Sequence, residues 1–276
     1  MTTEPTVDLD AYFARVGHDG PREPSLATLR ALHALQPATI PFEAIDVLLD
    51  RGVDLSPAAV DAKLITARRG GYCYEQNGLF KRVLTALGFE VEGLIARVRW
   101  NAPPGAPPRP RSHMALKVMI DGEPWLADVG FGGCVLTTPL RMVVDEPQAT
   151  PHERFRLVQA GRDLALEVEL PAGWTPVYEA SPEPQLDADY ETANWHTATH
   201  PSSPFRQVLM VARTTPDARR TLLGNRFTLR RPDGTLDRAD LDADGMAALL
   251  AGEFGLPVED SWRPLLERAV AAGEAG

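Results

Sequence analysis

The stretch 68-RRGGYCYEQN-77 places Cys73 directly after paired glycines and at the start of a predicted helix. Apolar residues follow it at helical spacing until Gly88 ends the run: Leu79, Phe80, Val83, Leu84 and Leu87. A thiol at a helix N-terminus lies near unpaired backbone N–H groups and the positive end of the helix dipole, and both favour the thiolate. The paired glycines would also let a substrate approach closely. This stretch therefore suggests a nucleophile.

A lone cysteine is more often a small buried apolar residue than a nucleophile. The chain has one other cysteine, Cys134. A catalytic interpretation of Cys73 therefore requires two further groups, a base and a residue that orients that base.

A predicted hairpin supplies candidates for both groups. The segment 112-SHMALKVMIDGEPWLADVG-130 alternates apolar and polar residues around Asp121-Gly122, a typical two-residue turn. With that turn, His113 and Asp128 lie on one face of the hairpin and within hydrogen-bonding reach. A four-residue loop would keep them on one face but farther apart, and a three-residue loop would separate the faces. Taken singly, each residue is more often an ordinary strand or surface residue, but the shared face favours a site.

Composition limits the other possibilities. The chain has 276 residues, 44% of them hydrophobic, enough for one large domain or two to three smaller ones. Its formal charge of −10 argues against nucleic acid as the main partner. No apolar run approaches the roughly 20 residues that span a bilayer, and the first ten residues do not resemble a secretory signal. We expect a cytoplasmic protein with reduced thiols, no membrane contact and no Cys-rich metal site.

The periodicity changes along the chain. Helices are predicted over 9–16, 26–36, from 57 onward, 73–87, 184–198 and 243–253. Strands are predicted over 91–100, 113–120, 124–130, 155–159, 164–170, 175–180, 207–214 and 222–231. The run of short antiparallel strands from residue 89 suggests a small barrel or sandwich, interrupted by an exposed proline-rich loop at 102–111.

Basic residues concentrate in one part of this acidic chain. Residues 93–120 hold no acidic residue and five basic ones, namely Arg97, Arg99, Arg109, Arg111 and Lys117. They could receive the phosphates of a cofactor. A solvated sheet face is an equally good explanation.

The cysteine motif, residues 69–77, resembles that of the arylamine N-acetyltransferases. The similarity continues in TIPFEAID (39–46), DVGFGG (128–133) and THPSSPF (199–205), so it covers nearly the whole chain. It implies an α+β, cysteine-protease-like fold in three parts. These are a helical bundle over 1–88, an antiparallel β-barrel with a helical connector over 89–198, and an α/β lid over 199–276.

The resemblance also implies roles for particular residues. Cys73, His113 and Asp128 would form a catalytic triad. The acceptor pocket would be lined by Phe42, Phe131 and Phe205, and Trp100 and Gly132 would lie near the CoA entrance. Each of these aromatic residues could instead belong to the core. The chain departs from the family pattern at Ala44, where Asn is usual, and this change is expected to affect a structural hydrogen bond.

The implied reaction moves an acetyl group from acetyl-CoA to an arylamine or arylhydrazine through an acetyl-cysteine intermediate, without a metal. A macrolactam-forming amide synthase of the same family is an alternative, and a cysteine peptidase is a weaker one. A CoA-binding scaffold with an idle triad is the non-enzymatic alternative. A homo-oligomer is possible.

Overall fold

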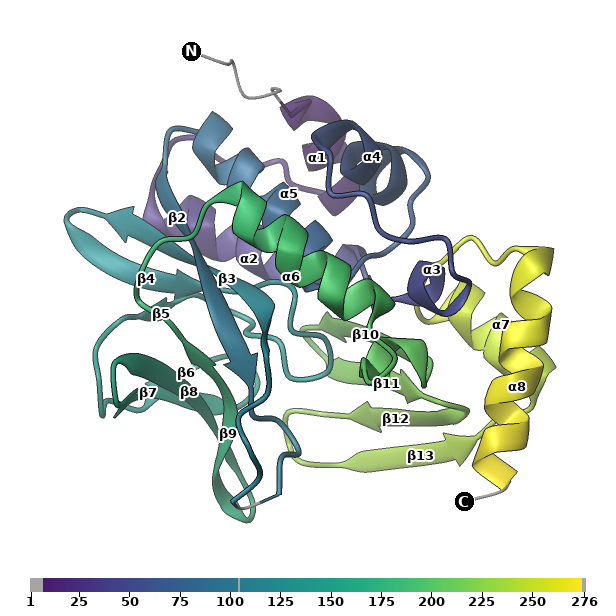
Figure 1. Ribbon diagram of the computed structural model, residues 1–276. Coiled ribbons are helices and arrows are strands. Elements are labelled where there is room, and N and C mark those ends of the chain that lie inside the picture. Colours follow the sequence, from purple (N-terminus) through teal and green to yellow (C-terminus); the bar gives the residue numbers. More distant parts are fainter. Residues whose placement is uncertain (1–6, 104, 275–276) are drawn as a thin grey trace.

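The computed structural model describes residues 7–103 and 105–274, and its first part is helical. Figure 1 shows these helices at the top, the barrel at the left and a second sheet at the lower right. The helices are α1 (Leu9–Val16), α2 (Leu26–Thr39), α3 (Ile45–Leu48), α4 (Pro57–Asp61) and α5 (Cys73–Ala86). A π-helical turn, Ala62–Thr66, continues α4. The helix predicted to begin at Cys73 is confirmed, with Leu79, Phe80, Val83 and Leu84 fully buried.

Helix α2 extends further than the sequence predicts. The prediction ended it before Pro37, but the helix includes this proline and runs to Thr39. Proline has no backbone N–H, so the helix gives up the one hydrogen bond that residue 37 would donate to the His33 carbonyl. The Ile40 amide still closes the turn by donating to the Gln36 carbonyl at 2.8 Å.

The barrel is an antiparallel sheet of eight strands in the order β5-β4-β3-β2-β9-β8-β7-β6. The strands are β2 (Glu90–Val98), β3 (Arg111–Ile120), β4 (Glu123–Ala127), β5 (Leu140–Arg141), β6 (Gln148–Ala149), β7 (Arg154–Ala160), β8 (Asp163–Leu170) and β9 (Gly173–Ala180). Its interior packs apolar side chains such as Leu94, Leu126, Phe155 and Val177. The other face of β3 packs on α5. This contact brings the strand that carries His113 to the helix that begins at Cys73.

A second sheet, in the order β1-β10-β11-β12-β13, forms the last part. Helix α6 (Asp187–Thr199) leads into it from the barrel, crossing the centre of Figure 1. The sheet's strands are β1 (Phe42–Glu43), β10 (Met210–Thr215), β11 (Ala218–Leu223), β12 (Arg226–Arg230) and β13 (Leu236–Asp240). Two helices accompany it, α7 (Ala243–Gly252) and α8 (Arg263–Glu274). Strand β1 comes from the N-terminal part and pairs with β10.

The predicted α+β architecture of helical bundle, barrel and α/β lid is confirmed. The exact division at residues 88 and 198 stays a prediction, since β1 joins the lid sheet from within the first segment. Helix α8 was absent from the sequence prediction. Among the described residues, no helix combines the length and apolar character needed to cross a membrane.

Candidate active site

Cys73 is the first residue of α5 and is 3% exposed. The turn before it is held by Glu75, whose Oε2 accepts a hydrogen bond from the Tyr72 amide at 3.0 Å. The Cys73 Sγ lies 3.7 Å from the carbonyl oxygen of Ser112, next to His113. The thiol therefore sits at the positive end of a helix and beside the strand that carries the candidate base.

The paired glycines serve the protein's own packing. A Cβ on Gly70 would lie 2.2 Å from the Pro41 carbonyl oxygen, and a Cβ on Gly71 would lie 2.7 Å from Glu75 Oε2. The segment that contains Phe42 runs against Gly71 as an isolated parallel bridge. The expectation that these glycines admit a substrate is thus wrong for Gly70, because protein backbone occupies the space.

The predicted hairpin is confirmed in its turn and register. Asp121 and Gly122 both have positive φ, 52° and 80°, as the two-residue turn requires. The ladder between β3 and β4 runs from Ile120 opposite Glu123 to Leu116 opposite Ala127 and stops there. His113 and Asp128 therefore lie just beyond the last regular pair, on the hairpin face where this register places them both.

His113 and Asp128 meet in the structure. The Nε2 atom of His113 lies 2.7 Å from Asp128 Oδ2, and the two residues are 2% and 0% exposed. This pairing leaves Nδ1 of the ring free of Asp128, and Cys73 lies close enough to raise the pKa of His113. The structure thus brings together the three residues that the sequence selects.

Charge interactions within this trio outweigh the effect of burial. Burial alone would lower the pKa of His113, but the Asp128 carboxylate raises it, and Cys73 adds to the increase. Burial alone would raise the pKa of Asp128, but His113 and the hydrogen bonds from Asn77 and Gly130 hold it below its usual value. The arrangement favours an imidazolium beside the Asp128 carboxylate.

Asn77 fixes Asp128 and was not assigned a role from the sequence. Its Nδ2 donates to Asp128 Oδ1 at 3.0 Å and to the Met114 carbonyl at 2.7 Å, and its Oδ1 accepts from the Val129 amide at 3.1 Å. Asn77 is four residues after Cys73, so both lie on one face of α5. That spacing is a signal from which the sequence could have identified it.

Two further residues hold Asp128 in place. The Nε2 of buried His33 accepts from the Asp128 amide at 3.0 Å, and burial lowers the pKa of His33 to about 4, so this ring stays neutral. The Gly130 amide donates to Asp128 Oδ1 at 2.9 Å. A Cβ on Gly130 would lie 2.9 Å from Cys73 Cα, which explains a glycine there. No local sequence signal connects His33 with a residue so distant in the chain.

The aromatic residues assigned to the acceptor pocket fall into two groups. The rings of Phe42 and Phe205 are 6.0 Å apart, and Phe205 is 5.7 Å from the ring of Tyr72. Phe131 instead stands edge-on to the His113 ring at 5.1 Å, beside Tyr178. Phe131 therefore lies against the His113 ring. Phe205 lies against Tyr72, the residue before Cys73, and Phe42 packs on Phe205.

The two residues predicted at the CoA entrance have different surroundings. Gly132 has a φ of +82°, and a Cβ there would lie 3.2 Å from the Phe42 ring, so Gly132 adjoins the first aromatic group. Trp100 is partly buried against the barrel interior, and its amide donates to the Val177 carbonyl at 3.0 Å. A role of Trp100 and Gly132 at the CoA entrance stays a prediction.

The predicted basic cluster is largely paired with acids from elsewhere in the chain. Three of its members have carboxylate partners: Arg99 with Glu179, Arg111 with Asp163 and Lys117 with Glu92. Arg97 donates to the Arg109 carbonyl at 2.7 Å. Within residues 7–103 and 105–274, neither Arg97 nor Arg109 has an acidic partner. The candidates for phosphate contact thus narrow to these two.

Cys134, unlike Cys73, does not begin a helix. It is buried in the barrel core, and burial raises its pKa to about 11. It therefore stays a thiol at neutral pH.

In the described part of the chain, no group of three or more His, Cys, Asp or Glu residues is placed to bind a metal.

Ala44 lies at the N-cap of α3 and gives that helix no side-chain cap. The Ile45 amide donates instead to Glu43 Oε2 at 2.8 Å. Because an asparagine side chain can accept from the first helical turn, we expect Ala44→Asn to raise the free energy of unfolding by about 1 kcal/mol. Denaturant titration measures this change, with turnover as a control for an unaltered site. An unfolding midpoint equal to or below that of the wild type would contradict the prediction.

Comparison with known proteins identifies the family to which the chain belongs. A family model described as N-acetyltransferase matches residues 25–263. The chain is 42% identical to the arylamine N-acetyltransferase of Escherichia coli (strain K12) over 255 residues, covering 92% of this chain and 90% of that protein. The structure of the M. tuberculosis arylamine N-acetyltransferase aligns with a TM-score of 0.91 at 39% identity, covering 95% of this chain and 99% of that one. The Mycobacterium marinum enzyme in complex with CoA aligns with a TM-score of 0.91 at 38% identity, over 95% and 98% of the two chains.

Proposed function

Because this chain belongs to the arylamine N-acetyltransferase family, we propose that its Cys73, His113 and Asp128 transfer an acetyl group from acetyl-CoA to an arylamine or arylhydrazine. One observation carries the assignment of residues. The His113–Asp128 pair, at 2.7 Å, lies beside a cysteine that begins a helix and whose Sγ is 3.7 Å from the Ser112 carbonyl oxygen. This is the arrangement that an activated thiol nucleophile needs.

In the first half of the reaction, the thiolate of Cys73 attacks the thioester carbonyl of acetyl-CoA. The raised pKa of His113 keeps the imidazolium beside the sulfur before the attack. The backbone amide of Cys73, at the helix start, is our candidate for stabilising the oxyanion that develops. His113 then gives its proton to the departing CoA sulfur, and an acetyl-cysteine remains.

In the second half, the amine attacks the acetyl carbonyl and His113 accepts the proton that it loses. Asp128 stabilises the imidazolium that forms again and fixes the ring orientation. Cys73 leaves as the thiolate, which restores the starting state. A neutral aromatic amine or hydrazine suits this step, since it is still nucleophilic at pH 7.

The surroundings of the thiol support an apolar acceptor. Cys73 and His113 are 3% and 2% exposed, and Phe131 stands edge-on to the imidazole. Phe42 and Phe205 form a second aromatic pair nearby. Such a site disfavours water, so the acetyl-enzyme should persist until an amine binds.

Steady-state kinetics test the proposed order of events. Because CoA leaves before the amine binds, double-reciprocal plots at several amine concentrations should give parallel lines. Acetyl-CoA and a panel of arylamines and arylhydrazines provide the measurement, with an aliphatic amine of similar size as the control. Lines that intersect would show that both substrates bind before either product leaves, and would contradict this mechanism.

The donor site is expected to depend on charge. Arg97 and Arg109 have no acidic partner in the part of the chain that the structure describes. We therefore expect Arg97→Gln and Arg109→Gln each to raise the KM for acetyl-CoA several-fold and to leave the KM for the amine unchanged. Added salt should have the same effect through screening. Lys117→Gln is the matched control, because Lys117 already pairs with Glu92. If both arginine variants match the control and the donor KM ignores salt, the cluster is a solvated surface.

Two finer aspects of the proposal rest on the sequence. We propose a cytoplasmic location, which fits a nucleophile that must stay reduced. Self-association stays a possibility, to be measured by sedimentation.

A further inference from the structure

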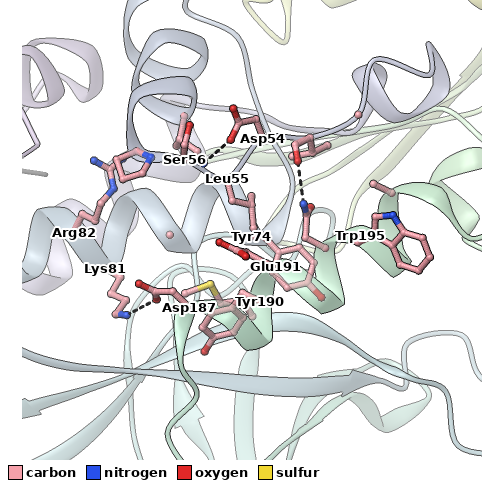
Figure 2. Close-up of a pocket in the computed structure, with 18 of the residues that line it drawn as sticks. Asp54, Leu55, Ser56, Tyr74, Lys81, Arg82, Asp187, Tyr190, Glu191 and Trp195 are labelled. Atoms are coloured by element: carbon pink, nitrogen blue, oxygen red, sulfur yellow. Dashed lines mark hydrogen bonds and ion pairs between the residues drawn. The ribbon is translucent and has the colours of Figure 1, made fainter. Parts of the chain in front are cut away.

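One cavity has none of the three triad residues in its lining. It has a volume of about 720 Å³ and lies on the far side of α5, between that helix, α6 and the loop 52–57. Figure 2 shows its lining, with the loop above, Lys81 and Arg82 at the left, and α6 contributing Tyr190, Glu191 and Trp195. Neither Cys73 nor His113 lines it, although their chain neighbours Tyr74 and Met114 do. A volume of this size suits a drug-sized molecule.

Aromatic and aliphatic side chains form the walls. Tyr74 of α5 and Tyr190 of α6 stand with ring centroids 6.2 Å apart. Trp195 lies one turn after Glu191 and is 68% exposed, an unusual exposure for an indole on a helix that packs against the barrel. Aromatic faces of this kind attract organic cations as well as apolar groups.

Gly78 keeps the cavity open on the α5 side. It lies inside a helix of 14 residues, where glycine costs about 1 kcal/mol relative to alanine. A Cβ there would meet no atom within 4 Å beyond its own helix and neighbours. A side chain at this position would therefore project into open space at the cavity wall without a clash.

The basic side chains at the rim of the cavity are paired with acids, whereas two of its acidic side chains are not paired with bases. Lys81 is paired with Asp187 at 3.0 Å, and Arg82 is paired with Asp61. Two other lining carboxylates, Glu191 and Asp54, have no cationic partner among the described residues. The rim thus offers unpaired negative charge while its positive charges are already engaged.

We propose that this cavity is a second binding site, separate from the acetyl-transfer site, for a small organic cation with an aromatic or apolar body. The apolar body would occupy the space beside Gly78, Tyr74 and Tyr190. The cationic group would lie near the carboxylate of Glu191 and the indole of Trp195. CoA, which carries several negative charges, does not match this rim.

Calorimetric titration with naphthylmethyl-trimethylammonium tests the site, because a quaternary ammonium cannot be acetylated. We expect binding to Cys73→Ser and to the wild type with equal affinity, undisturbed by saturating CoA. The uncharged carbon isostere, with a quaternary carbon in place of nitrogen, should bind at least several-fold more weakly. Trp195→Phe should weaken binding of the cation more than that of the isostere.

Two substitutions and a matched control locate the binding. Glu191→Gln should weaken it by roughly three- to tenfold. Glu183→Gln, which removes an exposed carboxylate outside the cavity, should leave it unchanged. Gly78→Leu should weaken binding at least tenfold and retain arylamine turnover, which also shows that this variant folds.

Four results would overturn the proposal. These are no binding up to the solubility limit of the cation, equal affinity for the uncharged isostere, displacement of the cation by CoA, and equal affinities of the Glu191→Gln and Glu183→Gln variants. The proposal does not depend on the acetyl-transfer mechanism, since it would stand if Cys73 were inert.

Discussion

Replacing Cys73 with serine is expected to lower acetyl transfer by roughly 10³-fold or more while the fold is retained. Serine has nearly the same size, but its hydroxyl is far too weakly acidic to ionise beside His113. The single-turnover rate of CoA release measures the loss, and the thermal unfolding midpoint measures the fold.

Cys134→Ser provides the matched control for this substitution. Cys134 is buried in the barrel core with a raised pKa, so its replacement should leave the rate near that of the wild type. Near-normal turnover by Cys73→Ser would remove Cys73 as the nucleophile. A large loss of rate in the control alone, with the fold intact, would transfer that role to Cys134.

Asp128→Asn is expected to cost activity more than stability, with a loss of up to about 10⁴-fold in rate. The amide keeps the shape of the carboxylate but cannot stabilise an imidazolium, and the Nδ2 group of Asn77 would then face another uncharged amide. The raised pKa of His113 should also fall, because its main cause is the charge of Asp128.

The pH dependence separates this electrostatic effect from a structural one. Loss of the negative charge should shift the ionisation of His113 in the rate profile to lower pH, since the raised pKa returns toward its usual value. His33→Gln disturbs the same loop through the Asp128 amide without removing the charge, so its profile should keep the wild-type midpoint. Activity of Asp128→Asn within a few-fold of the wild type would show that the His113–Asp128 pair is not needed.

The central part of the site was predictable because local rules determine it. A two-residue turn at Asp121-Gly122 fixes which residues of the two strands share a face, and this placed His113 with Asp128. The run from Cys73 to Gly88 determines a helix and hence the position of the thiol at its start. Both inferences need only neighbours in sequence.

The basic cluster shows where such reasoning fails. Residues 93–120, which include Arg99, Arg111 and Lys117, contain no acidic residue, yet each of the three has an acidic partner. Two of these partners, Glu179 and Asp163, come from strands far along the chain. Pairing across a sheet brings distant charges together, so a local count of charges overstates the free positive charge.

Other features depended on tertiary contacts that leave little trace in the sequence. His33 supports Asp128 across 95 positions of the chain. Strand β1 has only two residues, too few for an alternating pattern, and forms because β10 pairs with it. Gly70 is explained by the backbone of Pro41, which no inspection of residues 68–77 could reveal.

The central claim is that Cys73 carries the acetyl group between donor and acceptor, and one measurement tests it most directly. Enzyme mixed with acetyl-CoA alone should release a burst of up to one CoA per active site, and mass spectrometry of the digested protein should find one acetyl group, on Cys73. CoA release should then slow until an arylamine is added. A thioesterase would release CoA steadily without amine, and an idle scaffold would release none. An amide synthase that rejects acetyl-CoA would also show no burst. Any of these outcomes, or an acetyl group found on Cys134, would contradict the account.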